Sequence, residues 1–174
     1  IMNIIESNIY MSPSSYMLAR NCSMIFNCLE FSKNTLDDWY KKMEKTSKKR
    51  IVLLHNNLDV RHLIRNDENI LISWNNAKRG LPIYDFINLY KNNFGDYDFN
   101  ELYYEYKKRF PLTKEERMLI FIYLFIPDKL DLTKSEMAKT IDVARLCNYL
   151  VTTDKLFMEQ EAENAKEQKT KVNE

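Results

Sequence analysis

The sequence of 174 residues predicts a mainly α-helical protein in which helices surround a small β-hairpin. Three observations favour this fold class. Most segments place apolar residues three or four positions apart, which is the spacing of one helix face. Several of these segments begin with residues that cap helices. Two short runs, 51–54 and 69–74, instead carry the branched apolar residues typical of strands.

Two helices are predicted near the start of the chain. The first covers residues 13–31, because Ser12 followed by Pro13 is a cap with proline at the first helical position and the next apolar residues recur at helical spacing. A shorter amphipathic helix is predicted to follow, because Thr35 and Asp38 resemble a capping box. The basic stretch after it predicts a hinge.

The two predicted strands lie in the middle of the chain. Residues 51–54 and 69–74 are separated by the turn-forming residues Asn66 and Asp67. We expect the two strands to pair with each other. Because two strands alone are only marginally stable in water, helices must cover them.

The second half of the sequence predicts further helices. Pro82 opens one of them, and the others begin with a capping residue that is followed three positions later by glutamate. The pairs are Asp98 with Glu101, Thr113 with Glu116 and Thr133 with Glu136. Residues 118–126 are apolar on nearly all faces, so we expect them in a buried central helix.

The length fits one domain, which we place at residues 1–158. Residues 159–174 have alternating charge and no apolar stripe, which predicts a solvated helix end that frays into a partly disordered tail. The chain begins at Ile1 rather than at methionine, and its first residues resemble part of an apolar helix face without a cap. We therefore expect that an upstream segment is missing.

Composition excludes several classes of partner. The net charge is +1, so no bulk field draws the chain to nucleic acid or membrane. The longest apolar run, 118–126, is too short to cross a bilayer, which needs roughly 20 residues. The three cysteines form no disulfide or zinc pattern, which indicates free thiols in a reducing cytoplasm. The aromatic and basic helix "LYYEYKKRF" could stack on nucleic acid, but we interpret it as a half-buried helix with a solvated cationic end.

The sequence lacks several common catalytic patterns. Gly80 and Gly95 are its only glycines, so it contains no glycine-rich loop that cradles phosphates. His55 and His62 are the only histidines and have no third ligand at metal-binding spacing, so we expect no metal site. No GxSxG motif occurs that would support a hydrolase.

One stretch has an order of features that generic helical proteins lack. A predicted strand ends in His55, and a polar loop follows it. An apolar hairpin comes next and ends at Ser73 and Trp74. A Gly-x-Pro-x-x-Asp segment that ends at Asp85 then opens a helix. This order resembles the C-terminal lobe of the aminoglycoside phosphotransferases and choline kinases, which are protein-kinase-like enzymes. Their shared pattern is H-G-D-L-x-x-x-N, then an apolar strand ending I-D-W, then a helix bearing Asp.

The resemblance implies three catalytic positions. In that family the Asp of H-G-D accepts the proton of the substrate hydroxyl, the later Asn holds magnesium, and the Asp of I-D-W bridges magnesium to the nucleotide phosphates. By position these roles fall on Asn57, His62 and Ser73. An amide does not accept a proton near neutral pH, serine brings no negative charge to a hard cation, and neutral histidine is a poor magnesium ligand. The catalytic and metal-binding acids are therefore replaced.

The positions that the chain retains are architectural. The resemblance implies that His55 hydrogen-bonds to the backbone and fixes the shape of the loop, and that Leu58 packs beneath it. It also implies that Asp85 braces the loop from the helix below, while Trp74 fills the space beside the strand.

Three residues are candidate ligand contacts, namely Asp59, His62 and Trp74. Asp59 is also a candidate for a displaced base, because it lies two residues beyond Asn57. Side chains two apart on a loop point different ways, so we interpret Asp59 as a solvent-facing loop acid.

These observations lead to three hypotheses of function. We expect a degenerate phosphotransferase lobe, a pseudokinase, whose cleft binds a small molecule or a protein partner. One alternative is an active small-molecule phosphotransferase that uses ATP and magnesium when joined to its missing N-terminal lobe. The other is a non-catalytic interaction module with an aromatic face made by Trp39, Tyr40 and residues 103–106.

Overall fold

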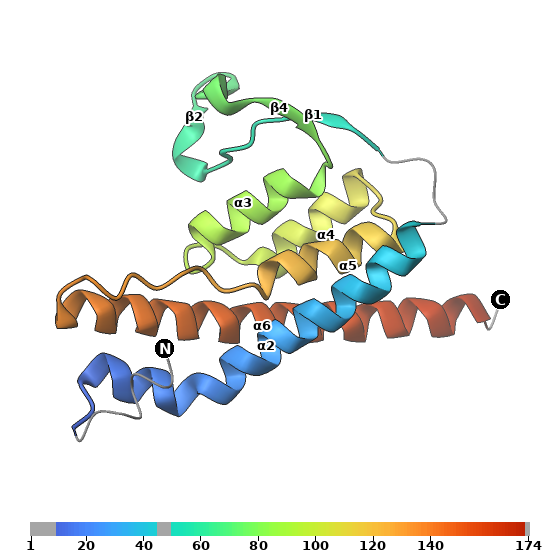
Figure 1. Ribbon diagram of the computed structural model, residues 1–174. Coiled ribbons are helices and arrows are strands. Elements are labelled where there is room, and N and C mark those ends of the chain that lie inside the picture. The colour runs from blue at the N-terminus through green and yellow to red at the C-terminus, as the bar shows by residue number, and fades with distance from the viewer. Residues whose placement is uncertain (1–9, 45–49, 173–174) are drawn as a thin grey trace.

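The computed structural model describes residues 10–44 and 50–172, with side chains described up to residue 165. Within these residues the protein is mainly helical with small antiparallel strand pairs, so the predicted fold class is confirmed. The long helices α2 and α6 cross at the base, the shorter helices lie above α6, and the strands lie above α3 (Figure 1). The helices are α2 (Pro13–Met43), α3 (Ile83–Asn93), α4 (Phe99–Arg109), α5 (Lys114–Leu124) and α6 (Glu136–Val172).

Helix α2 is one continuous helix, so the prediction of two separate helices was wrong. It starts as predicted, with the Ser12 hydroxyl accepting the N–H of Ser15 and Pro13 in the first turn. The segment around Thr35 continues the helix because α2 packs against both α5 and α6. In the second half, the Trp39 indole N–H donates to the carbonyl oxygen of Glu115 at 3.0 Å. These tertiary contacts outweigh a local capping signal.

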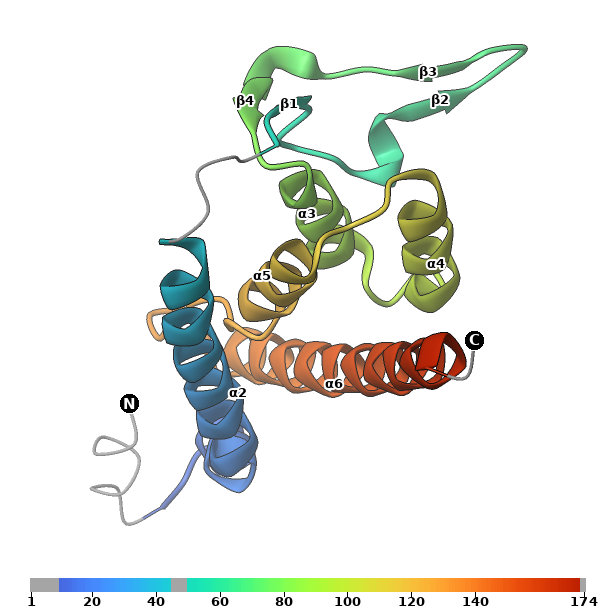
Figure 2. The ribbon, with the colours of Figure 1, turned by 90° about the vertical axis from the view of Figure 1, so that its right-hand side faces the viewer.

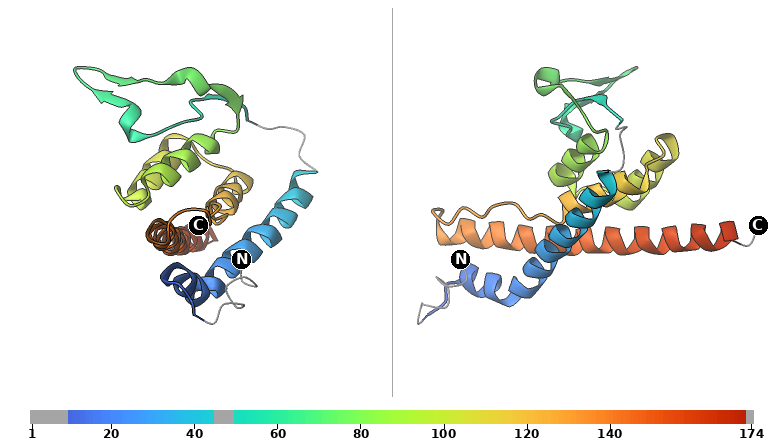
Figure 3. Two further views of the ribbon diagram at one scale, coloured as in Figure 1. Left: turned by 60° about the vertical axis from the view of Figure 1, so that its left-hand side comes forward. Right: turned by 45° about the vertical axis from the view of Figure 1, so that its right-hand side comes forward.

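The strands form two separate pairs, so the predicted pairing of 51–54 with 69–74 was also wrong. Strand β1 (Val52–Leu54) pairs with β4 (Lys78–Gly80), and β2 (Leu63–Arg65) pairs with β3 (Asn69–Leu71), both antiparallel. The turn at Asn66 lets β3 fold back on the segment directly before it, at a lower entropic cost than a longer loop. In both views of Figure 3 the segment that holds the four strands, residues 52–80, lies beyond α3 as an arm, which is called the strand arm below.

The predicted caps of α4 and α5 are confirmed. The Asp98 carboxylate accepts the N–H groups of Asn100 and Glu101, and Thr113 and Glu116 form a reciprocal capping box. Helix α5 lies at the centre of the main core, as its apolar sequence predicts. Its buried apolar residues are Leu119, Ile120, Phe121, Ile122 and Leu124.

Arg50 joins the strand arm to the helices. Its guanidinium pairs with the Glu116 carboxylate, with 2.9 Å between Nε and Oε1, and also donates to the carbonyl oxygen of Pro111. The same group lies 4.3 Å from the centre of the Phe110 ring. The arm is therefore fixed two residues before β1.

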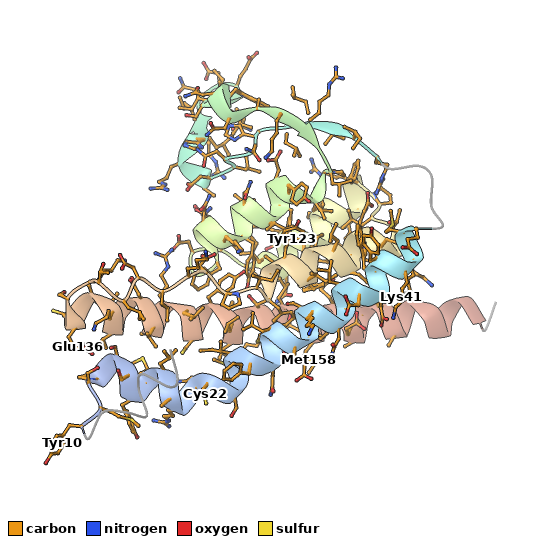
Figure 4. The ribbon with its side chains drawn as sticks, in the orientation of Figure 1. Tyr10, Cys22, Lys41, Tyr123, Glu136 and Met158 are labelled. Carbon is orange, nitrogen blue, oxygen red and sulfur yellow. The ribbon has the colours of Figure 1, made fainter. Side chains whose placement is uncertain are left out.

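Helix α6 begins differently from the prediction. The Thr133 hydroxyl donates to Asp131, and it is the Ser135 hydroxyl that accepts an N–H of the first turn, from Ala138. Glu136 instead accepts the N–H of Ser14 at 2.8 Å and so joins the start of α6 to the start of α2. Figure 4 shows Glu136 at this end of α6.

Helix α6 continues past residue 158 to Val172. Lys107 holds this part of the helix, because its ammonium group donates to Gln160 and Glu163 at 2.7 Å each. No helix in the described residues is long and apolar enough to span a membrane. All three cysteines lie in the described residues and are free.

Candidate functional site

The candidate site is the loop that follows β1, together with the strand arm and the start of α3. From β1 the chain passes His55, makes a 3₁₀ turn at Val60–His62, and runs out and back through β2 and β3. It then passes Ser73 and returns through β4 to pair with β1 (Figure 2). The two ends of the stretch therefore meet directly above α3.

Asp85 fastens this loop to α3. It lies in the first turn of the helix, and its two carboxylate oxygens accept two consecutive backbone N–H groups, those of His55 and Asn56, at 2.8 Å each. The acceptor and donors are about 30 residues apart in the sequence. Charge-assisted hydrogen bonds of this kind are stronger than neutral ones, so the carboxylate fixes the backbone where the loop begins.

His55 ties the other end of the loop to the first. Its side chain is 1 % exposed, and its Nε2 lies 2.7 Å from the carbonyl oxygen of Ile72, the residue before Ser73. Because a carbonyl only accepts, Nε2 carries the proton. The other ring nitrogen, Nδ1, is buried and has no hydrogen-bond partner among the described residues. The rings of Trp74 and His62 lie 4.9 and 5.5 Å from the His55 ring.

Two residues of the loop have left-handed backbone conformations. Asn56 has a φ of 60° and Ser73 a φ of 67°. Asparagine is among the few residues other than glycine that tolerate this region, so Asn56 suits its position. In the pattern that the loop resembles, this position is the glycine of H-G-D.

The three positions implied to be catalytic lie close together. His62 Nδ1 is 2.9 Å from the carbonyl oxygen of Asn57, and the backbone oxygen of His62 accepts the N–H of Ile72 at 2.9 Å, next to Ser73. None of the three side chains is a carboxylate. No group of three or more His, Cys, Asp or Glu residues that could hold a metal occurs in the part of the chain that the structure describes.

Asp59 is buried, so its interpretation as a solvent-facing acid was wrong. Its side chain is 3 % exposed, and it caps the 3₁₀ turn by accepting the N–H of Arg61 at 2.9 Å. The Arg61 guanidinium also donates to both carboxylate oxygens, at 3.0 and 2.7 Å. These hydrogen bonds lower the pKa of Asp59 to about 2. A carboxylate held this way is a weak base, and its function is to shape the loop.

Acid is expected to remove the contribution of Asp59 to stability. Its pKa is lower in the folded state than the ordinary value of about 3.9, so the contribution is complete above about pH 4 and is lost as the pH falls toward 2. Unfolding of the wild type and Asp59→Asn by urea, measured from about pH 6 to pH 3, should therefore show a difference that shrinks with acid. Arg61→Met should shift this loss to higher pH. A difference that is constant with pH would contradict the assignment.

Sequence reasoning missed two supports of the loop. The first is Arg61, although the Asp-x-Arg spacing inside one turn is a local signal that could have shown it. The second is Asn92, whose amide donates to the carbonyl oxygen of Leu58 at 3.1 Å from the far end of α3. Asn92 also lines a cavity of about 450 Å³ between α3, α6 and the segment before α6, whereas Asn57 and Ser73 do not line it.

Comparisons with protein families, with curated proteins and with solved structures found no match for this chain.

Proposed function

We propose that this chain is a degenerate phosphotransferase lobe whose loop binds a small molecule or a protein partner without transferring a phosphoryl group. The observation that carries the proposal is the Asp85 carboxylate, which accepts two consecutive N–H groups of a loop that has no carboxylate at positions 57, 62 and 73. The brace implied by the resemblance is present, and the reactive groups are not.

The local geometry supports this proposal in a second way. Asn56 adopts the left-handed conformation for which the resembling pattern uses glycine, and Asn57 follows it on the fixed backbone with an exposed side chain. Asp85 and His55 hold the two ends of the loop. Such fixation is what a binding or catalytic loop needs, because its groups must stay in one geometry.

The residues at the reactive positions argue against catalysis. An amide at Asn57 cannot remove a proton from a substrate hydroxyl, and loss of a general base commonly costs on the order of 10² to 10⁴ in rate. The nearest acid in the sequence, Asp59, is paired with Arg61. Ser73 offers no charge to magnesium, which prefers carboxylate and phosphate oxygens.

Titration with ATP, with and without magnesium, tests the proposal. We expect no phosphoryl transfer to water or to added alcohols, and no stabilisation that depends on magnesium, since no carboxylate is placed to hold the cation. The measurement is the heat-unfolding midpoint together with release of labelled phosphate. A ligand at about a hundred times its dissociation constant would stabilise the fold by about 2.7 kcal/mol, which is readily seen. Magnesium-dependent stabilisation or phosphate release would favour the active-enzyme alternative.

A second candidate function, a protein interaction module, is favoured by the strand arm. Ile64 and Ile70 lie directly opposite each other in the β2–β3 pair and are 45 and 50 % exposed. Leu53, Ile72 and Trp74 are also exposed. Exposed apolar side chains that gather on one element are typical of an interaction site. Of the aromatic face expected from the sequence, Tyr40 and Tyr104 are exposed, whereas Tyr103 is buried and the Trp39 indole donates to α5.

A further inference from the structure

A cavity of about 500 Å³ lies between α2, α5 and α6, away from the loop. It is bounded by α2, α4, α5 and α6, and no residue of the strand arm lines it. Its volume falls within the range of about 300–1,000 Å³ that is usual for sites of small ligands. The proposed function makes no use of this cavity.

One wall of the cavity is aromatic. Phe31 from α2, Phe121 from α5 and Phe157 from α6 line it. The Phe157 ring makes edge contacts with the other two, at 5.2 Å from Phe31 and 5.0 Å from Phe121. Because each ring is fixed by its neighbours, the wall is preformed and suits a flat or extended apolar group.

Tyr103 lines the same cavity and brings an unpartnered donor to it. The residue is 1 % exposed, and its hydroxyl has no hydrogen-bond partner among the described residues. A buried hydroxyl without a partner costs free energy, so a ligand that accepts a hydrogen bond from it would relieve this cost. Burial raises the pKa of Tyr103, which keeps the hydroxyl protonated and able to donate.

Charged groups line the cavity beside Tyr103. Its cations are Lys42, Lys114 and Arg117, and its carboxylates are Glu115 and Glu161, so positive charge is in excess. The Arg117 guanidinium donates to the Asn164 side chain at 3.2 Å. It retains further N–H groups, because a guanidinium has five. Arg117 also lowers the pKa of Tyr103, although less than burial raises it. The Arg117 guanidinium therefore lies near the Tyr103 hydroxyl.

We propose that this cavity binds a small amphiphilic anion, namely a carboxylate with an aromatic or medium-chain body. The apolar body packs against Phe31, Phe121 and Phe157, and the carboxylate accepts hydrogen bonds from Tyr103 and Arg117. Two donors and excess positive charge at one side of an apolar wall select an anionic head over a neutral one.

Energy transfer to a bound dye tests the proposal. Trp39 lies beside the cavity, because its indole bonds to the backbone of the lining residue Glu115. In the Trp74→Phe variant Trp39 is the only tryptophan. We expect saturable transfer from Trp39 to 8-anilinonaphthalene-1-sulfonate, which octanoate reverses. Because 1-octanol has no charge to pair with Arg117, it should need a concentration higher by about tenfold or more.

Three further variants locate the binding site. Thr35→Phe fills the cavity from α2, Arg117→Met removes the cation, and each should weaken octanoate binding by about tenfold or more. The matched control is Arg145→Met, since Arg145 lies over Phe94 outside this cavity and its loss should leave the affinity unchanged. Circular dichroism checks that each variant folds. If Arg117→Met does not fold, the affinity of Thr35→Phe for octanoate tests the proposal. Dye transfer that does not saturate, equal displacement by 1-octanol, or unchanged affinity in the variants would overturn the proposal.

Discussion

Replacing Asp85 by asparagine is expected to destabilise the fold by about 2–4 kcal/mol, because two charge-assisted hydrogen bonds to the loop backbone are lost or weakened. An asparagine keeps one accepting oxygen, but its NH₂ group then faces the N–H of either His55 or Asn56 and cannot accept it. Urea unfolding gives the change in free energy. Acrylamide quenching of tryptophan fluorescence, to which Trp74 beside the His55 ring contributes together with Trp39, reports release of the loop.

Asp98→Asn is the matched control for this substitution. Asp98 also accepts two backbone N–H groups, those of Asn100 and Glu101, but both lie in the first turn of its own helix. Since asparagine caps helices about as well as aspartate, the control should lose less than about 0.5 kcal/mol. A similarly small loss in both variants would mean that Asp85 acts as an ordinary first-turn acid and does not brace the loop.

The sequence predicts those features of this fold that depend on neighbouring residues. The capping box of Thr113 and Glu116 and the cap at Asp98 are local, since each involves atoms at most three residues apart. The apolar run 118–126 is a composition signal of equal strength, and the helix it predicts lies in the main core. Such local signals predict the same structure whatever the fold of the rest of the chain.

Features that depend on distant residues were predicted less well. Thr35 resembles a cap, but its helix continues because Trp39 and other residues of α2 pack on α5 and α6. Strand β1 pairs with β4, and nothing in the apolar run 51–54 indicates that its partner is the polar segment Lys78–Gly80. The pairing depends on how the whole strand arm folds back onto α3, and no pattern of neighbouring residues predicts that.

The candidate site combines both kinds of feature. The resemblance implies bracing roles for His55 and Asp85, and their hydrogen bonds join the loop to Ile72, just after β3, and to α3. It gave no indication that Asp59 is buried against Arg61, because that pair depends on the 3₁₀ turn. Nor does it imply that the His55 Nδ1 is buried without a hydrogen-bond partner among the described residues.

Placing aspartate at residues 57 and 73 and asparagine at residue 62 is expected to create a magnesium site. The triple variant Asn57→Asp, His62→Asn and Ser73→Asp places two carboxylates and an amide on positions that the backbone already brings together. Aspartate tolerates the left-handed conformation of residue 73 better than most residues, so the change requires no new backbone geometry. Without metal the added carboxylates repel each other, so the variant should be less stable than the wild type.

Heat unfolding with increasing magnesium measures this effect. The triple variant should gain about 2.7 kcal/mol at a hundred times its dissociation constant, whereas the wild type should not respond. The matched control is Asn75→Asp with Asn76→Asp, which adds the same two charges at exposed positions of the arm and should respond only weakly. Equal stabilisation of both variants would indicate nonspecific screening and would contradict the proposal that the loop retains the geometry of a metal-binding catalytic loop. A specific response would mean that only three side chains separate this loop from a metal site, because Asp85 and His55 already hold the backbone in place.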